Sequence, residues 1–214
     1  MPEFCSSSDN SDVQSFLRSA SATMTKERCL LARKWTENRT SRLYEMAHCT
    51  TKSGSLVEQV IGNLNIRYTE AMERGRRLEK DVIRLMKEIL KTDIEDCGLL
   101  LDSRFPVIGA SPDGVGNDFV VEIKCPMTPK AESRYITANY RVANKFLAQI
   151  QLQMFLKNVK KGYFCVATHD FETSHAIKLI CVEYDKDFLL DLIEKAMAFW
   201  PENIYPLIFQ SAKS

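Results

Sequence analysis

The sequence predicts an α/β (α+β) fold in which a central mixed β-sheet is flanked by helices. Apolar residues recur at every third or fourth position over residues 70–90 and 140–156, which is the period of an amphipathic helix. Short apolar runs bounded by turn-forming residues occupy 98–125, 163–168 and 176–184, and such runs are typical of β-strands. Because helical and strand segments are mixed along the chain, we expect the strands to form one sheet with helices packed on it.

Both ends of the chain extend this plan. A helix is predicted over residues 26–35, and a last helix is predicted to be capped by Asp185 and to end near residue 199, before Pro201. The first residues are rich in Ser and Asp and have little apolar surface to bury, so they are expected to be flexible. The 214 residues therefore divide into a flexible lead over 1–22 and a single domain over 23–214, with a core over about 70–184 and a C-terminal helix over 185–200.

Composition and cysteine spacing exclude several classes of protein. Hydrophobic residues make up 45% and charged residues 27% of the chain, as in a globular protein, and no apolar run approaches the roughly 18 residues of a membrane span. The seven cysteines are odd in number and lie at least 16 residues apart, so they form no paired-cysteine metal or redox motif. Because no secretion signal is recognisable either, we expect reduced thiols and an intracellular location, nuclear or cytoplasmic.

The charges nearly cancel in total, but they are unevenly distributed. The 29 Lys and Arg against 28 Asp and Glu give a net charge of +1. Residues 26–42 hold six basic and two acidic side chains, whereas residues 183–202 hold six acidic and two basic ones. A basic N-terminal face is suited to bind phosphate backbones, but two ordinary solvent-exposed helix faces explain the same pattern equally well.

The residues that carry chemistry lie in the strand predicted over 119–125 and in the turn before it. Side chains alternate along a strand, so Glu122 and Lys124 project together from one face. Asp113 lies in the Ser-Pro-Asp-Gly turn of residues 111–114, and a hairpin of this length brings it back beside Glu122. Two neighbouring carboxylates repel one another unless a cation lies between them, and oxygen ligands are those that Mg²⁺ and Mn²⁺ prefer.

Two further polar residues are predicted to point inward. Glu79 lies three, four and seven positions before apolar residues of the helix over 70–90, and so shares its buried stripe. Gln151 falls on the apolar face of the helix over 140–156 by the same test. If the elements pack as predicted, both side chains meet the carboxylates and the lysine of the strand. Each residue also has a simpler interpretation. Glu122 and Lys124 would form an exposed strand pair, and Asp113 would belong to a plain turn. Glu79 would pair on the helix surface with a nearby arginine, and Gln151 would be a core amide.

Three motifs follow one another along the chain: Gly-Ala-Ser-Pro-Asp-Gly at 109–114, Val-Glu-Ile-Lys-Cys-Pro at 121–126 and Gln-Ile-Gln-Leu-Gln-Met-Phe at 149–155. Upstream, Arg74 and Gly75 precede Glu79. Over about residues 33–170 the chain resembles the PD-(D/E)xK nuclease superfamily and, more narrowly, the lambda exonuclease or YqaJ viral recombinase group. The resemblance implies a restriction-endonuclease-like core with an N-terminal helical annex.

The resemblance also implies a metal-dependent active site. It assigns Asp113, Glu122 and the backbone carbonyl of Ile123 as metal ligands. It assigns Lys124 to the positioning of the attacking water, and Glu79 to a second metal or its water. The implied cofactor is Mg²⁺ or Mn²⁺, as two ions. Relatives with an iron–sulfur cluster use grouped cysteines, which are absent from this sequence, so no such cluster is expected.

Binding of a DNA 5′-phosphate is a further implication of the resemblance. The candidate residues are Ser111, Gln149, Gln151, Ser41, Arg42, Arg39, Lys34 and Arg33. Alignment on Ser41 and the arginine after it assigns the basic role to Lys34 or Arg33. Alignment on Trp35 assigns it to Arg39 instead, and both alternatives stay open.

The function expected from the resemblance is that of a Mg²⁺-dependent deoxyribonuclease. It would be a 5′-to-3′ exonuclease acting on double-stranded DNA ends in recombination, repair or viral-type DNA processing. Its partners would be 5′-phosphorylated duplex ends, with no membrane; the oligomeric state and a single-strand annealing or recombination partner stay open. Two alternatives remain: an endonuclease of the same superfamily, and a nucleic-acid-binding module that keeps the fold without catalysis.

Overall fold

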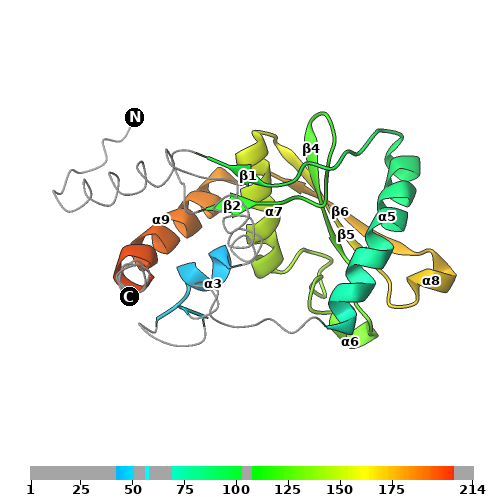
Figure 1. The fold of residues 1–214 in the computed structure, drawn as a ribbon, viewed down its shortest axis with the longest axis horizontal. Helices are drawn as coiled ribbons and strands as arrows, with labels where there is room; N and C mark the ends of the chain where they lie inside the picture. Colours follow the sequence, from blue (N-terminus) through cyan, green and yellow to red (C-terminus); the bar gives the residue numbers. More distant parts are fainter. Residues whose placement is uncertain (1–41, 51–55, 58–68, 103–107, 205–214) are drawn as a thin grey trace, which may run out of the picture.

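The computed structural model describes residues 42–50, 56–57, 69–102 and 108–204. The predicted flexible lead and the predicted helix over 26–35 lie outside these residues. Within them, helices cover both faces of a central sheet (Figure 1): α5 (Glu70–Leu90) lies on one side, and α7 (Asn144–Lys157) and α9 (Lys186–Asn203) lie on the other. The predicted fold class is confirmed.

The central sheet is mixed, with four strands in the order β3-β4-β5-β6. These strands are β3 (Gly114–Val115), β4 (Phe119–Lys124), β5 (Lys161–Ala167) and β6 (Ile177–Glu183). β4 pairs with β5 in parallel, whereas the two outer pairs are antiparallel. A separate two-stranded sheet consists of β1 (Leu100–Leu101) and β2 (Gly109–Ala110). The strands predicted over 163–168 and 176–184 correspond to β5 and β6, which form an antiparallel pair, and their connection contains the short helix α8 (Phe171–Ser174).

α5 has the predicted bounds and packs on one face of the sheet. The Thr69 hydroxyl caps its first turn by accepting the Met72 N–H at 3.3 Å. Its buried stripe, from Leu78 to Met86, packs in one core with odd-numbered residues of β4 such as Val121. Burial of this stripe determines which polar side chains of α5 lie near β4.

α7 is buried on two sides. Ile150 and Met154 pack against the face of the sheet opposite to α5. Ala148 and Leu152 instead pack in a second core with α9 and the short helix α3 (Leu43–Ala47). A helix enclosed in this way presents apolar side chains in two directions, so apolar spacing alone does not define its inner face.

The start of α7 differs from the prediction. The sequence predicts a start near residue 140, but the helix begins at Asn144. Ile136 pairs with Val142 in a small antiparallel bridge, and Tyr140 between them adopts a left-handed conformation with φ of 58°. This turn is incompatible with a continuous helix, so helical backbone starts only after it.

The end of α9 also differs, because the helix continues past Pro201, where the sequence predicts a stop. Phe199 and Ile204 are buried in the core shared with α3 and α7. The Asn203 Nδ2, also buried, donates to the Phe199 carbonyl oxygen at 2.9 Å. Burial of this last turn outweighs the backbone hydrogen bond that proline removes.

In the described ranges, no helix combines the length and the apolar character needed to cross a membrane.

Candidate active site

The β3–β4 hairpin places Asp113 against β4. Gly114, the first residue of β3, pairs with Val121 of β4. Asp113 donates its N–H to the Val121 carbonyl oxygen at 3.0 Å, and its Oδ2 accepts from the Ile123 N–H at 2.6 Å. A side chain at position 114 would collide with Ile94, whose Cγ2 lies 2.5 Å from the place of a Cβ. Glycine is therefore required next to the aspartate.

Glu122 is almost completely buried, and both of its carboxylate oxygens accept hydrogen bonds. Its side chain is 2% exposed. Oε1 accepts from the Lys124 ammonium and from the Gln149 Nε2, the latter at 2.7 Å. Oε2 accepts from the Gln153 Nε2 at 2.6 Å. Two glutamines of α7 and the lysine of its own strand thus converge on this carboxylate.

In this cluster, the negative charge of Glu122 makes ionisation of the neighbouring carboxyl groups less favourable. Burial raises the pKa of Asp113, and the nearby charge of Glu122 raises it further, so that it lies well above its ordinary value in spite of Lys124. Burial, followed by Glu122 and Asp96, also raises the pKa of Glu79. Glu79 of α5 is therefore close enough to interact electrostatically with the strand carboxylates. A divalent cation would relieve this repulsion.

The donor atoms fit a hard divalent cation, although they are not gathered around a common point. Among the residues that the structure describes, no three His, Cys, Asp or Glu side chains have the arrangement of a metal site. Asp113 and Glu122 offer carboxylate oxygens, and the Ile123 carbonyl shares a strand edge with its N–H, on the side of Asp113. The Lys124 ammonium occupies Glu122 Oε1. Metal binding at that oxygen therefore requires Lys124 to withdraw.

Gln151 does not belong to this cluster, and the prediction that it meets the carboxylates is wrong. Its Nε2 donates to the Glu183 carbonyl oxygen and its Oε1 accepts from the Asp185 N–H, both at 2.8 Å. The amide is 1% exposed and joins β6 to the start of α9. Residues two apart on a helix point to nearly opposite sides, so Gln149 and Gln153 face the carboxylates while Gln151 faces away.

Gln153 is the site residue that sequence reasoning missed. The available signal was its spacing of four residues from Gln149, which places both amides on one helix face. Its Nε2 also lies 3.4 Å from the Ser111 carbonyl oxygen, and the Ser111 hydroxyl donates to the Gly98 carbonyl oxygen at 3.1 Å. Ser111 and Gln149 therefore border the carboxylate cluster, and their part in phosphate binding stays a prediction.

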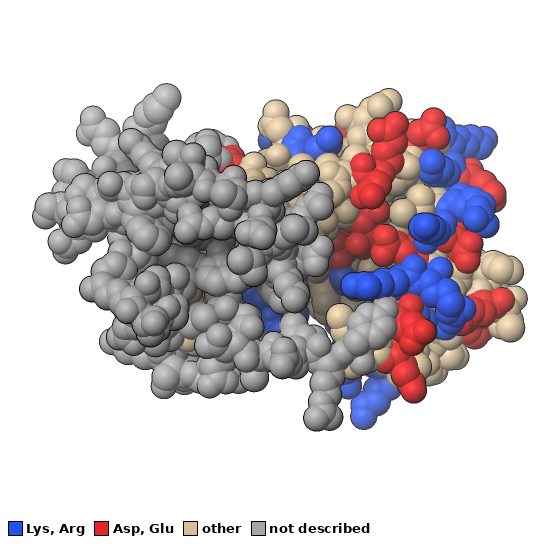
Figure 2. Space-filling view, viewed as in Figure 1, with Lys and Arg blue, Asp and Glu red and all other residues tan. Residues whose placement is uncertain are grey.

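The predicted basic residues are described only in part. Arg42 precedes α3 and is half-buried. The other N-terminal candidates, Ser41, Arg39, Lys34 and Arg33, lie outside the described residues. On the face shown in Figure 2, Lys and Arg side chains lie among Asp and Glu side chains over the described part of the surface. On α5, Arg84 forms an ion pair with Asp81 at 3.2 Å. That part of the surface presents mixed charge and no continuous basic patch.

Arg74 fixes α5 to the ends of the two parallel strands and is 8% exposed. Its guanidinium donates to the carbonyl oxygens of Pro126 at 3.3 Å, Thr168 at 3.2 Å and His169 at 2.9 Å. It also forms an ion pair with Glu172 of α8. Because Glu79 follows on the same helix, these contacts also set the position of Glu79 relative to β4.

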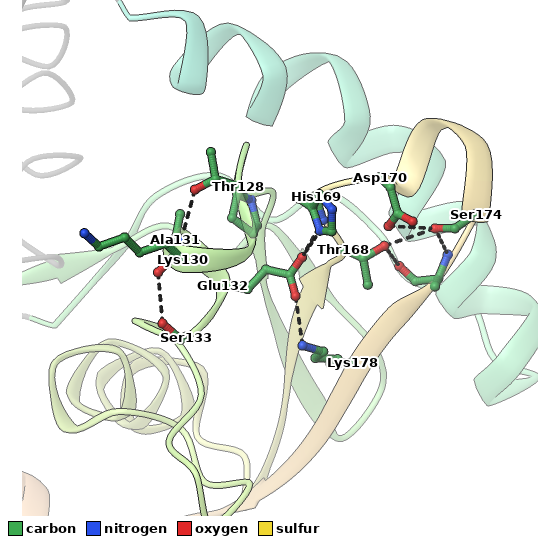
Figure 3. Close-up of polar contacts among 12 residues, drawn as sticks. Thr128, Lys130, Ala131, Glu132, Ser133, Thr168, His169, Asp170, Ser174 and Lys178 are labelled. Carbon is green, nitrogen blue, oxygen red and sulfur yellow. Dashed lines mark hydrogen bonds and ion pairs between the residues drawn. The ribbon is translucent and has the colours of Figure 1, made fainter.

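A second polar cluster holds α6 (Pro129–Glu132), the short helix that follows β4 (Figure 3). Glu132 Oε1 accepts from the His169 N–H at 2.6 Å and lies 2.7 Å from its Nδ1, while Oε2 accepts from the Lys178 ammonium at 2.8 Å. Burial alone would raise the pKa of Glu132, but the hydrogen bonds from Lys178 and His169 outweigh it and lower the pKa. The ionised carboxylate joins the segment after Lys124 to the turn that follows β5 and to β6.

The fold and the aspartate, glutamate and lysine of the β3–β4 hairpin define the class of protein, the PD-(D/E)xK nuclease superfamily. Within it, the model of the YqaJ-like viral recombinase domain matches residues 19–160. The chain belongs to this family. A comparison with curated proteins finds no match.

Solved structures described as exonucleases have a similar fold. The alkaline exonuclease LHK-Exo from Laribacter hongkongensis has a TM-score of 0.68 and 22% identity, with 88% of this chain and 99% of that one covered. LHK-Exo in complex with dAMP has a TM-score of 0.67 and 22% identity, with 85% and 96% covered. A phage-related exonuclease from Haemophilus somnus 129PT has a TM-score of 0.61 and 13% identity, with 82% and 96% covered. At these identities the similarity shows a shared fold.

Proposed function

We propose that this protein is a divalent-metal-dependent deoxyribonuclease that hydrolyses double-stranded DNA from its ends in the 5′-to-3′ direction. The observation that carries the proposal is the buried cluster of Asp113, Glu122 and Lys124 on one hairpin, with Glu79 near it. Membership of the YqaJ-like family and the fold shared with proteins described as exonucleases support it.

In this proposal Asp113, Glu122 and the Ile123 carbonyl hold Mg²⁺ or Mn²⁺, and Glu79 holds a second ion or its water. A bound divalent cation lowers the pKa of the attacking water and neutralises charge that develops on the phosphate. The protein itself contributes Lys124. This side chain leaves Glu122 Oε1 and donates a hydrogen bond to the attacking water or to a phosphate oxygen.

The substrate end is held by residues around the carboxylates. Ser111 and Gln149 border the cluster and have hydroxyl and amide groups that suit a 5′-phosphate. Arg42 supplies positive charge for the same group, together with Arg39 or with Lys34 or Arg33 of the segment before it, and Ser41 supplies a hydroxyl. The biological setting is DNA recombination, repair or viral-type processing inside the cell, beside a single-strand annealing or recombination partner.

The test uses a linear duplex and a covalently closed circular duplex of the same sequence, each with Mg²⁺ or with EDTA. The linear duplex is expected to be degraded to mononucleotides from its 5′-phosphorylated ends with Mg²⁺ only, and the circle is expected to stay intact. Cleavage of the circle would identify an endonuclease instead. Salt-sensitive binding to both DNAs without any metal-dependent cleavage would identify a binding module.

A further inference from the structure

Gln153 is buried more deeply than Gln149, the other glutamine that donates a hydrogen bond to Glu122. Its side chain is completely buried, with 0% exposure, whereas Gln149 is half-buried. Both amides donate to the Glu122 carboxylate, but to different oxygens: Gln149 to Oε1 and Gln153 to Oε2. Oε1 is also the oxygen that Lys124 contacts. The two oxygens of the carboxylate therefore have different surroundings.

The orientation of the Gln153 amide is set by the charge of Glu122. With the N–H groups toward Oε2, the Gln153 Oε1 is buried and has no hydrogen-bond partner among the described residues. The reverse orientation would place that oxygen against a carboxylate oxygen, which is worse. An apolar side chain would avoid the cost of the unpaired acceptor, but it would leave the buried Glu122 Oε2 without this donor, so the amide at this position serves the carboxylate.

We propose that Gln153 is a positioning residue that holds Glu122 by Oε2 while Oε1 exchanges Lys124 and Gln149 for a metal ion. The inference rests on the proposed function, since it concerns the same carboxylate. Gln153 keeps its bond when the ion binds, because it lies behind the carboxylate in the core. Gln149 loses its bond and becomes free to contact the substrate.

The test measures Mn²⁺ binding by calorimetry in the wild type, Gln153→Met and Gln151→Leu, at a temperature where all three proteins are folded. Methionine keeps the length of glutamine and removes the N–H donor. Loss of an outer contact to a metal ligand weakens metal affinity by about 10- to 100-fold, and this is the change expected for Gln153→Met. Gln151→Leu is the matched control, a buried glutamine two residues away without contact to Glu122.

Gln151→Leu is expected to lower the melting temperature by at least about 4 °C, since it removes the buried amide that pairs with the Glu183 carbonyl oxygen and the Asp185 N–H, and to keep the wild-type Mn²⁺ affinity. Wild-type Mn²⁺ affinity in Gln153→Met, with wild-type cleavage of DNA, would overturn the inference and leave the proposed function intact. Equal weakening in both variants would overturn it as well. Absence of Mn²⁺ binding by the wild type would overturn both proposals.

A second measurement needs no variant to fold. In ¹⁵N spectra of the wild-type protein, the Gln153 side-chain amide is expected to stay protected from solvent exchange when Mg²⁺ is added. The Gln149 amide is expected to shift and to exchange faster. Loss of protection at Gln153 on addition of Mg²⁺ would show that it releases Glu122, contrary to the inference.

Discussion

Replacement of Glu122 by Gln or of Lys124 by Ala is expected to lower the rate of Mg²⁺-dependent DNA cleavage by at least about 1,000-fold. Glutamine at position 122 removes a negative oxygen ligand from a site whose other carboxylate, Asp113, is already disposed to bind protons. Alanine at position 124 removes the ammonium that lies next to Glu122. Burial opposes the positive charge of Lys124, but Glu122 and Asp113 outweigh it and raise its pKa, so the ammonium is charged at neutral pH.

The measurement is the initial rate of nucleotide release from a 5′-labelled linear duplex. Lys161→Ala is the matched control, because this lysine lies on the neighbouring strand, is 45% exposed and forms an ion pair with Asp118 at 3.8 Å. Its rate should equal that of the wild type. Circular dichroism confirms that each variant is folded. Cleavage within about threefold of the wild type by either site variant would contradict the assignment of Glu122 and Lys124.

Replacement of Arg74 by Leu is expected to lower the free energy of unfolding by about 3 kcal/mol. The variant removes a buried guanidinium and leaves the carbonyl oxygens of Pro126, Thr168 and His169 without this donor. These groups lie where α5 meets the ends of β4 and β5. The loss is measured by urea unfolding at pH 7. Because Glu79 shares this helix, DNA cleavage should fall as well.

Arg77→Leu is the control for Arg74→Leu, because Arg77 pairs with the same carboxylate, Glu172, but is 59% exposed. Its effect on stability should stay below about 1 kcal/mol. Hydrogen bonds from Arg74 and then Arg77 lower the pKa of Glu172 from 4.5 to about 2. This contribution is present above pH 4.5 and is lost as the pH falls toward 2, so the acid sensitivity between these values should be smaller in Arg74→Leu. Equal effects of the two substitutions would contradict the account of Arg74.

The parts of the site that lie close together in the sequence could be predicted from it. Asp113, Glu122 and Lys124 lie within twelve residues on one hairpin, and the alternation of side chains along β4 places the last two on a common face. The inward-facing residues of α5 after its first turn could also be predicted, because the apolar residues of this helix form a single buried stripe. In these cases local geometry determines the arrangement.

Interactions between distant segments could not be predicted in this way. Arg74 contacts residues more than fifty positions away, and Glu132 of α6 contacts His169 in the turn after β5 and Lys178 on β6. No sequence period relates such pairs. The prediction for Gln151 is wrong because α7 is buried on two sides. In such a helix, apolar spacing does not tell whether a residue faces the sheet or the core with α9.

In the proposed active site, Asp113 and Glu122 bind one divalent cation together. Anomalous diffraction from crystals soaked in Mn²⁺ tests it most directly. We predict a manganese peak at about 2.1 Å from an oxygen of each carboxylate, with Lys124 withdrawn from Glu122 Oε1 and Gln153 still bonded to Oε2. Crystals with fully occupied manganese elsewhere and none shared by Asp113 and Glu122 would contradict it.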